Sequence, residues 1–314
     1  MSIVASSGVP CFGKPGSLMP SKDLEALIRR LVASVSLAGA PLLLSGCSPF
    51  ARSSCDGFQS TSYTVVLDAG TQLDGGDCSE LCKNWQCTPT TTDAGAPAVI
   101  CQTYCVGRPP SGLALEDVSQ RCETGGYLAR MAALEQASVG SFVRLSRELA
   151  AHGAPASLVA AARRSAADER RHAKSVARLA RAHGAAQVRF APVARSVRPL
   201  IELALENATS GCVLETYGAV EAAWQAAHAT DPKVRTAMQA LAPDEARHAA
   251  LAWKVEAWAQ RQLSAPERRE LIRARKAAVT ALVDAPSVQL AGLGLPDDTA
   301  RAKLLAGLAG SIWS

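Results

Sequence analysis

The sequence predicts a mainly α-helical protein: a four-helix bundle with one long crossover connection, preceded by a small disulfide-rich module and followed by further helices. Of its 314 residues, 48% are hydrophobic but only 4% are aromatic. The core must therefore be built from Ala, Leu and Val, which suits close-packed helices better than a β-sandwich. Seven of the ten cysteines crowd between Cys55 and Cys122. After Tyr127, apolar helical segments alternate with a short turn, a long connection and a second short turn, which is the order of such a bundle.

Residues 1–46 are predicted to be a leader that directs export. Arg29 and Arg30 precede an apolar run over residues 31–44, and a charged start before a short apolar stretch is typical of a signal peptide. The run is too short to span a bilayer comfortably. Its ending, Leu-Ser-Gly-Cys, resembles the bacterial lipobox, which implies lipidation of Cys47 and a place in the bacterial cell envelope, at the outer membrane or on the periplasmic face. The alternative is a buried apolar helix.

Residues 47–121 are predicted to form a small module stapled by disulfides, because clustered cysteines pair in oxidising compartments. With the leader removed and Cys47 lipidated, eight cysteines remain, enough for four bridges of open connectivity. Their spacing does not fit a zinc ribbon and no histidine lies near them, which favours disulfides over zinc. Residues 62–67 and 98–105 are expected to be strands. The disulfide candidates are Cys55, Cys78, Cys82, Cys87, Cys101, Cys105, Cys122 and Cys212.

The bundle is expected over residues 122–263, with a helical C-terminal extension over residues 264–314. Breaks at Gly153 and Gly184 separate its helices, and Asp231 followed by proline is a standard helix opening, an N-cap and then a prolyl first turn. The expected bundle helices are 127–151, 156–183, the segment from Pro199 to 229, and 232–263. Two shorter helices are expected over 264–284 and 297–312.

One five-residue pattern occurs in both the second and the fourth of these helices. It reads DERRH over residues 168–172 and DEARH over residues 244–248, and so accounts for two of only five histidines. Residues three apart share a helix face, so the glutamate and histidine of each copy can offer an oxygen and a nitrogen to one metal ion. The pairs are Glu169 with His172 and Glu245 with His248.

The first and third helices each carry a glutamate, Glu135 and Glu215, directly after a leucine on an otherwise apolar stripe. An ionised carboxylate buried in a helical core is very costly without a partner. Four such groups require partners, and two divalent cations would serve. The alternative for the second helix is a solvent-exposed face with ion pairs between residues four apart, which its arginines would allow. That alternative leaves Glu135 and Glu215 unexplained.

One Glu from each of two helices, with Glu-x-x-His from each of the other two, is a known di-metal arrangement. With these six residues the chain resembles the ferritin-like di-iron carboxylate superfamily from about Tyr127 to Leu263. The resemblance implies that Glu169 and Glu245 bridge two metal ions, that Glu135 and Glu215 are terminal ligands, and that His172 and His248 bind one ion each.

The resemblance also extends to the aspartate that precedes each bridging glutamate. It implies that Asp168 and Asp244 accept a hydrogen bond from a ligand histidine across the bundle, which fixes the histidine tautomer. Two features depart from the pattern. Pro243 stands inside the fourth helix, where it would open the bundle beside the metals or start a new helical segment. Cys212, one turn before Glu215, is either a thiol near the metals or, as we favour, a disulfide partner of the cysteine-rich module.

Carboxylates and imidazoles suit iron, with manganese as the alternative. The resemblance implies chemistry with dioxygen or peroxide and an unidentified reductant or substrate, in an exported, lipid-anchored oxidoreductase. The second hypothesis is a non-catalytic metal-binding or structural envelope lipoprotein, since fold alone does not settle function. The net charge of +5 is spread along the chain without interleaved aromatics, so no nucleic-acid partner is expected.

Overall fold

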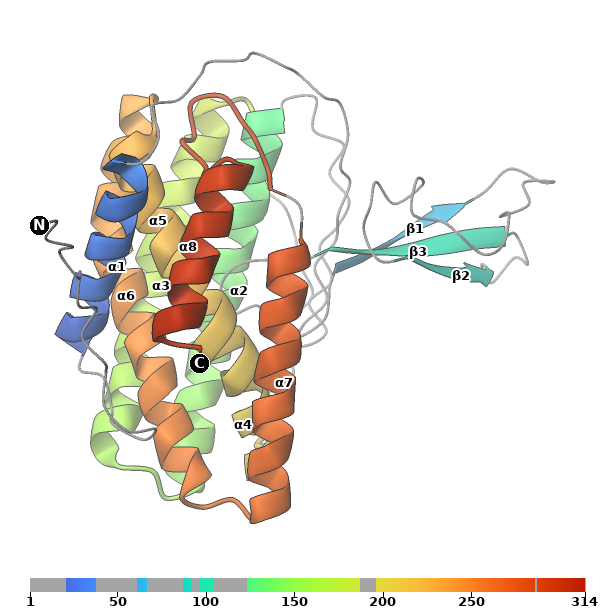
Figure 1. The fold of residues 1–314 in the computed structure, drawn as a ribbon, viewed down its shortest axis with the longest axis vertical. Coiled ribbons are helices and arrows are strands. Elements are labelled where there is room, and N and C mark those ends of the chain that lie inside the picture. The colour runs from blue at the N-terminus through green and yellow to red at the C-terminus, as the bar shows by residue number, and fades with distance from the viewer. Residues whose placement is uncertain are drawn as a thin grey trace, which may run out of the picture.

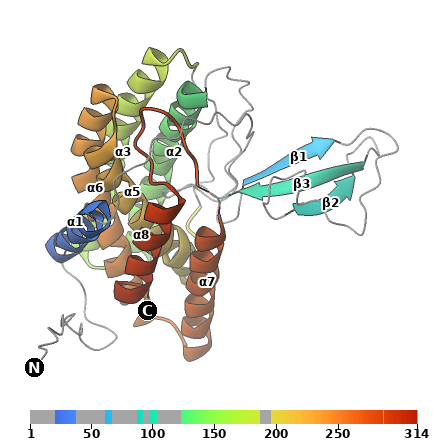
Figure 2. The same cartoon turned by 45° about the horizontal axis from the view of Figure 1, so that its top comes forward.

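A computed structural model of the protein shows a helical bundle. The helices lie side by side, and a small sheet stands to one side of them in both views (Figures 1 and 2). The mainly helical class is therefore as predicted. Within the part of the chain that is described, no helix is both long and apolar enough to cross a membrane. The described residues are 21–37, 61–66, 87–91, 97–103, 123–186, 196–285 and 287–313.

Four helical segments form the bundle, and their bounds lie within a few residues of those predicted. Glycines with positive φ follow α2 and α3, Gly153 at 72° and Gly184 at 75°, a conformation that glycine adopts without strain and that ends helices. The Asp231 side chain accepts hydrogen bonds from the first backbone N–H groups of α6, as an N-cap does. The segments are α2 (Glu123–Ala151), α3 (Ala156–Ala182), the run of α4 (Leu200–Glu206), η2 (Asn207–Glu215) and α5 (Thr216–His228), and α6 (Pro232–Gln260).

The third segment contains a feature that the sequence did not predict, because its middle part, η2, is a π-helix. A π-helix is wider than an α-helix and often occurs at functional sites. The hydroxyl of Thr209 donates to the carbonyl oxygens of Leu205, at 3.0 Å, and Glu206, at 3.2 Å. The last residue of η2 is Glu215, so the wide turns lie directly before one of the predicted ligands.

Helix α6 runs through Pro243 as a single helix from Pro232 to Gln260. The proposed start of a new helical segment at Pro243 is therefore wrong. Proline removes one backbone donor from a helix, but here the buried residues on both sides hold the helix together. The carbonyl oxygen of Pro243 accepts a hydrogen bond from Nη1 of Arg247 at 3.2 Å.

Two of the three apolar clusters in the described core lie on either side of the predicted ligands. Along α3, the buried apolar residues up to Ala166 belong to one cluster and those from Val176 onward belong to the other. Glu169 and His172 occupy the interval between them, both buried. The bundle is thus closed by packing above and below its polar middle.

Two further helices follow the bundle, as predicted for the C-terminal extension. Helix α7 (Ala265–Asp284) begins with a capping box between Ser264 and Glu267, and α8 (Asp298–Ser311) begins with Asp297 as its N-cap. These caps satisfy backbone donors that the first helical turn leaves without partners.

Helix α1 (Ser21–Leu37) lies within the predicted leader and packs against the bundle beside α6, α5 and α8 (Figure 1). Its buried stripe joins the largest apolar cluster, through Leu24, Ile28, Val32 and Val35. A Cβ atom at Gly307 would lie 2.2 Å from Cδ1 of Leu31, so a larger residue there would force the Leu31 side chain to move. As folded here, residues 21–37 fit the alternative of a buried apolar helix. Removal of the leader stays a prediction.

The sheet has three antiparallel strands in the order β1-β3-β2. Two of them match the predicted strands, namely β1 (Thr61–Val66) and β3 (Pro97–Thr103), while β2 (Cys87–Thr91) was not predicted. The register places the backbone of Cys87 opposite that of Cys101. The other predicted disulfide partners upstream of the bundle, and the lipidation candidate Cys47, lie outside the described residues.

Candidate metal centre

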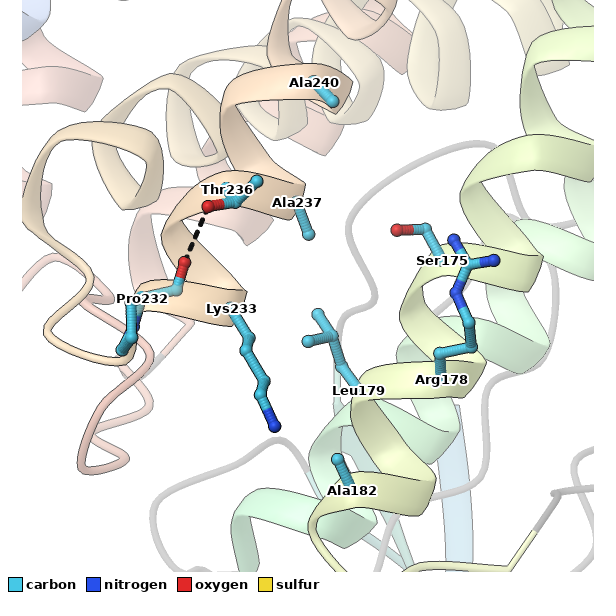
Figure 3. Close-up of a pocket in the computed structure, with 9 residues that line it drawn as sticks. All are labelled: Ser175, Arg178, Leu179, Ala182, Pro232, Lys233, Thr236, Ala237 and Ala240. Carbon is cyan, nitrogen blue, oxygen red and sulfur yellow. Dashed lines mark hydrogen bonds between the residues drawn. The ribbon is translucent and has the colours of Figure 1, made fainter.

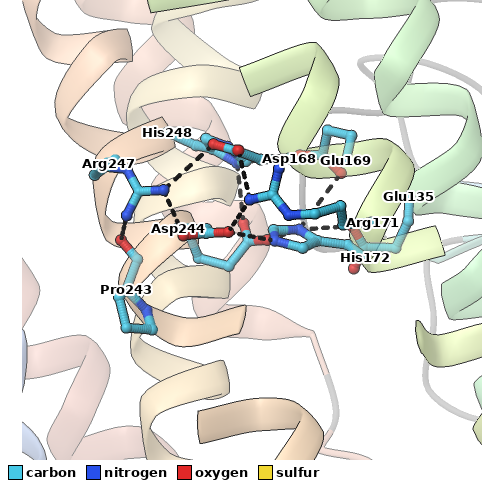
Figure 4. A network of polar contacts seen from close by, with 10 residues as sticks. Glu135, Asp168, Glu169, Arg171, His172, Pro243, Asp244, Arg247 and His248 are labelled. Carbon is cyan, nitrogen blue, oxygen red and sulfur yellow. Dashed lines mark hydrogen bonds and ion pairs between the residues drawn. The ribbon is translucent and has the colours of Figure 1, made fainter. Parts of the chain in front are cut away.

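The six predicted ligands meet in the polar middle of the bundle, although they come from four helical segments. Glu135 is on α2, and Glu215 ends η2. The pairs from the repeated pattern are on α3 and α6, which lie side by side (Figure 4). Four of the six are buried outright, and the side chains of the other two, Glu135 and Glu245, are each 13% exposed. The sequence therefore predicted which residues come together.

The two histidines point their Nδ1 atoms at the same pair of carboxylates. Nδ1 of His172 lies 2.9 Å from Oε1 of Glu245 and 3.9 Å from Oε2 of Glu169. Nδ1 of His248 lies 3.1 Å from Oε1 of Glu169 and 3.6 Å from Oε2 of Glu245. Each of these two glutamates thus offers one oxygen toward each histidine, which is the geometry that a bridging carboxylate needs.

The remaining two glutamates each stand on one side of this pair. Oε2 of Glu135 lies 3.6 Å from Nδ1 of His172, whereas Glu215 is grouped with His248. Ligand atoms come within 4.8 Å of one another in two sets that share Glu245: Glu135, Glu169, His172 and Glu245 in one, and Glu215, Glu245 and His248 in the other. The cluster, which we call the metal cluster, could therefore hold metal at two adjacent positions.

Two aspartates hold the histidines from the opposite side, each across the helix pair (Figure 4). Nε2 of His172 lies 3.2 Å from Oδ2 of Asp244, and Nε2 of His248 lies 3.4 Å from Oδ2 of Asp168. An ionised carboxylate can only accept a hydrogen bond, so each histidine must carry its proton on Nε2. That tautomer leaves the Nδ1 lone pair free to bind a metal ion.

Two arginines complete this outer layer, and sequence reasoning missed them. Nη2 of Arg171 donates to Asp168 at 2.7 Å and to Asp244 at 2.9 Å. Arg247 likewise contacts both aspartates. The two arginines and two aspartates form a ring with no net charge on the solvent side of the histidines. The available signal was the arginine directly before the histidine in both DERRH and DEARH.

The pKa values of the cluster show how strongly it attracts positive charge. Burial acts to lower the pKa of His172, but the nearby carboxylates of Glu135 and Glu245 outweigh it and raise that pKa to about 11. Burial, followed by repulsion from Glu135, raises the pKa of Glu169. Burial also acts to raise the pKa of Asp168, but His248 and Arg171 lower it to about 2. Without metal, the cluster therefore retains protons to limit its negative charge.

The residues fit a pair of divalent cations in charge and in donor type. The four glutamates carry four negative charges when ionised, which two divalent cations would neutralise while both histidines stay neutral. Four buried atoms that could donate an electron pair to a metal ion form no hydrogen bond with any described group. They are Oε2 of Glu169, Nδ1 of His172, Oε1 of Glu245 and Nδ1 of His248. Buried polar atoms are rarely left so, and coordination to metal would satisfy them.

Among the described residues, the disulfide favoured for Cys212 is not found. Cys212 is a fully buried thiol inside η2, and it forms no disulfide with any described residue. The amide of Asn207 donates to its sulfur at 3.7 Å and also to the carbonyl oxygen of Ala252 at 2.9 Å. Packing in the bundle core keeps this thiol away from the surface, where a partner from another module would have to reach it.

Comparison with known proteins adds no assignment: no protein-family model matches the chain, and no curated protein or solved structure matches it either. The helical fold and its cluster of glutamates and histidines are compatible with a ferritin-like fold.

Proposed function

We propose that this protein binds two metal ions, preferably iron, in the metal cluster. With these ions it acts as an oxidoreductase on dioxygen or peroxide. The strongest support is that the Nδ1 atoms of the two histidines point at the same two carboxylates. Neither Nδ1 atom forms a hydrogen bond with a described group. Hard carboxylate oxygens combined with imidazole nitrogens favour iron or manganese over softer metals. When bound, the pair supplies electrons to oxygen.

The residues of the chain have separate tasks in this proposal. Glu169 and Glu245 would contribute to both metal positions, while Glu135 and Glu215 would complete one position each. Asp168 and Asp244 keep the histidine protons on Nε2. The apolar clusters on either side exclude water from the centre, which strengthens every electrostatic interaction inside it.

The alternative is a metal-binding protein without catalysis, in which the ions only stabilise the bundle. The same ligands serve both functions, because neutralising four buried carboxylates stabilises the fold whatever chemistry follows. Reaction with oxygen separates the two. A stable metal pair that does not react with air would support the structural alternative.

The first experiment counts and oxidises the iron. The full-length protein is loaded with Fe(II) without oxygen, iron per chain is measured, and air is admitted while the near-ultraviolet absorption of the oxidised pair is followed. We expect two irons per chain and a band that grows on oxygenation. Glu169→Ala should lose both. Glu202→Ala, at an exposed glutamate of α4, is the matched control and should keep both. Equal iron in wild type and Glu169→Ala would refute the site.

Export and lipid anchoring at Cys47 form a separate part of the proposal, supported by the sequence alone. Cleavage before Cys47 would remove α1 and uncover the apolar surface that Leu24, Ile28 and Val32 now cover. The intact mass of the protein purified from a bacterial host decides the matter. A lipidated chain starting at Cys47 supports export, and a chain that retains α1 refutes it.

A further inference from the structure

The solvent face of α3 carries a row of cations. The row begins at Arg163 and continues 7, 11, 15 and 18 residues further along the helix, at positions 170, 174, 178 and 181. These spacings keep the side chains on one helix face. Two more arginines, each next to a member of the row, widen it. All seven are exposed, and they extend over roughly 27 Å at the helical rise. This basic face consists of Arg163, Arg164, Arg170, Arg171, Lys174, Arg178 and Arg181.

No acidic residue on α3 offsets these charges at the surface. The only acidic residues of the helix, Asp168 and Glu169, are both buried. Arg171 is held by two aspartates, whereas the other six cations form no ion pair with any described residue. Like charges four residues apart, as at 170, 174 and 178, destabilise a helix by roughly 0.2–0.5 kcal/mol each. Seven of the 33 cations of the chain therefore share one exposed helix face, at a cost in helix stability.

The neighbouring helix α6 extends the positive surface across the seam. Lys233 and Arg178 stand on opposite sides of a depression of about 670 Å³, whose walls are otherwise mostly alanine, leucine and small polar residues (Figure 3). A second, smaller depression of about 120 Å³ is bordered by Arg164, Arg247 and Lys254. The seam between α3 and α6 is thus basic at both ends, with the metal cluster beneath its middle.

We propose that the basic face of α3 is the docking surface for an acidic one-electron donor protein. This inference rests on the proposed function, which requires electrons from outside the chain. Glu169 and His172 stand on the inner side of the helix that carries the basic face, so a docked donor would be separated from the metals by about one helix diameter, roughly 10–12 Å. Guanidinium groups suit the carboxylates of an acidic surface because they bind them in a planar, two-point geometry.

The electron balance of the step is simple. After oxygen has oxidised both metal ions to the trivalent state, each encounter oxidises one donor cofactor and reduces one metal ion to the divalent state. Two encounters restore the pair. A membrane surface is the less favoured occupant, because α3 exposes no large apolar side chain that could insert between lipids.

The test uses a reduced plant-type two-iron ferredoxin, an acidic protein, as the donor. Stopped-flow absorption follows loss of the oxidised-iron band in the full-length, iron-loaded protein. Electrostatic steering predicts a rate that falls about 10-fold or more between about 20 mM and about 300 mM salt. The triple variant Arg170→Glu, Lys174→Glu, Arg178→Glu should react about 10-fold or more slowly at low salt, because charge reversal at an interface mainly lowers the association rate.

The matched control reverses the same number of charges elsewhere. The variant Arg269→Glu, Arg273→Glu, Lys276→Glu changes three exposed cations of α7 and should react like wild type. Dithionite, which needs no docking surface, should reduce wild type and both variants equally. If ferredoxin reduces the α3 variant as fast as wild type, the docking surface is refuted.

Two other outcomes would also overturn the inference, and they can be told apart. If dithionite cannot reduce the oxidised pair even in wild type, the proposed function fails and the docking surface fails with it. If the α3 variant instead loses only its sedimentation with phosphatidylglycerol vesicles, while its ferredoxin rate is unchanged, the basic face binds membranes.

Discussion

Two groups of buried glutamates in the same bundle are balanced in opposite ways. Near the end of α2, Glu148 receives two hydrogen bonds from the guanidinium of Arg198, at 2.7 and 2.9 Å. Glu206 receives one from Arg198 and one from Arg144, both at 2.7 Å. Two carboxylates thus meet two guanidinium groups. In the metal cluster, four carboxylates meet only two histidines.

The difference shows that this core can neutralise buried carboxylates with its own arginines where the fold requires it. Arginines do stand close to the metal cluster, but they bind the outer aspartates rather than the ligands. The negative charge at the centre is therefore left for cations that the chain does not supply. Glu148 and Glu206 thus have their guanidinium partners within the protein, whereas Nδ1 of His172 and of His248 form no hydrogen bond with a described group.

Among the substitutions, the largest expected effect comes from breaking the balanced group. Arg198→Ala would leave Glu148, whose side chain is fully buried, without its ion-pair partner. Removing one partner of a buried ion pair typically costs about 3–5 kcal/mol of unfolding free energy, and we expect about 3 because Arg198 is itself partly exposed. Urea unfolding measures the loss. Arg198→Lys should lose less, and an unchanged midpoint for Arg198→Ala would show that the group is not structural.

The next effect tests the unbalanced group. Adding Fe(II) or Mn(II) without oxygen should stabilise the protein, because the metal binds the folded state only. At 100 times the dissociation constant the gain is about 2.7 kcal/mol for each site, visible as a rise in the thermal midpoint. The Glu245→Ala variant should show little gain, since Glu245 belongs to both ligand sets. If neither metal raises the thermal midpoint of the wild-type protein, the metal site is contradicted.

A third effect has opposite signs in the two groups. In metal-free protein at pH 7, Glu169→Gln should raise the unfolding free energy by about 1 kcal/mol, because it removes a carboxyl group whose pKa burial and Glu135 raise. Glu148→Gln should lower it by at least as much, because Arg198 loses the carboxylate that accepts two of its hydrogen bonds. Parallel urea titrations of both variants give the comparison. If both variants lost the same unfolding free energy, the two groups of glutamates would be neutralised in the same way.

The sequence predicted the metal cluster better than the balanced group, for a physical reason. A repeated five-residue pattern at helical spacing places ligands on one face without knowledge of the tertiary fold. Arg198, in contrast, reaches Glu148 from a position 50 residues away, just before α4, and no local pattern connects them. The π-helix before Glu215 and the burial of Cys212 likewise depend on tertiary packing, so helix propensity gave no signal for either.

The smallest effect concerns a buried carboxylate that is less fully neutralised than Glu148 but does have an arginine partner. Glu256 is buried, and its Oε1 accepts hydrogen bonds from Gln260 at 2.9 Å and from Arg275 at 3.1 Å. Burial raises the pKa of Glu256 above its usual 4.5, although Gln260 and Arg275 act to lower it. A raised folded-state pKa means that its contribution to stability is present in full below pH 4.5 and is lost as pH rises through the folded-state value.

Replacing Glu256 by glutamine should therefore flatten the decline in stability above pH 4.5 and should stabilise the protein at pH 7 by less than about 1 kcal/mol. Urea unfolding at several pH values between 4.5 and 8 measures the slope. The exposed Glu202→Gln variant should leave it unchanged. A steeper slope for Glu256→Gln would mean that the single guanidinium of Arg275 balances this carboxylate as fully as Arg198 balances Glu148, so that one arginine is enough to make a buried glutamate structural.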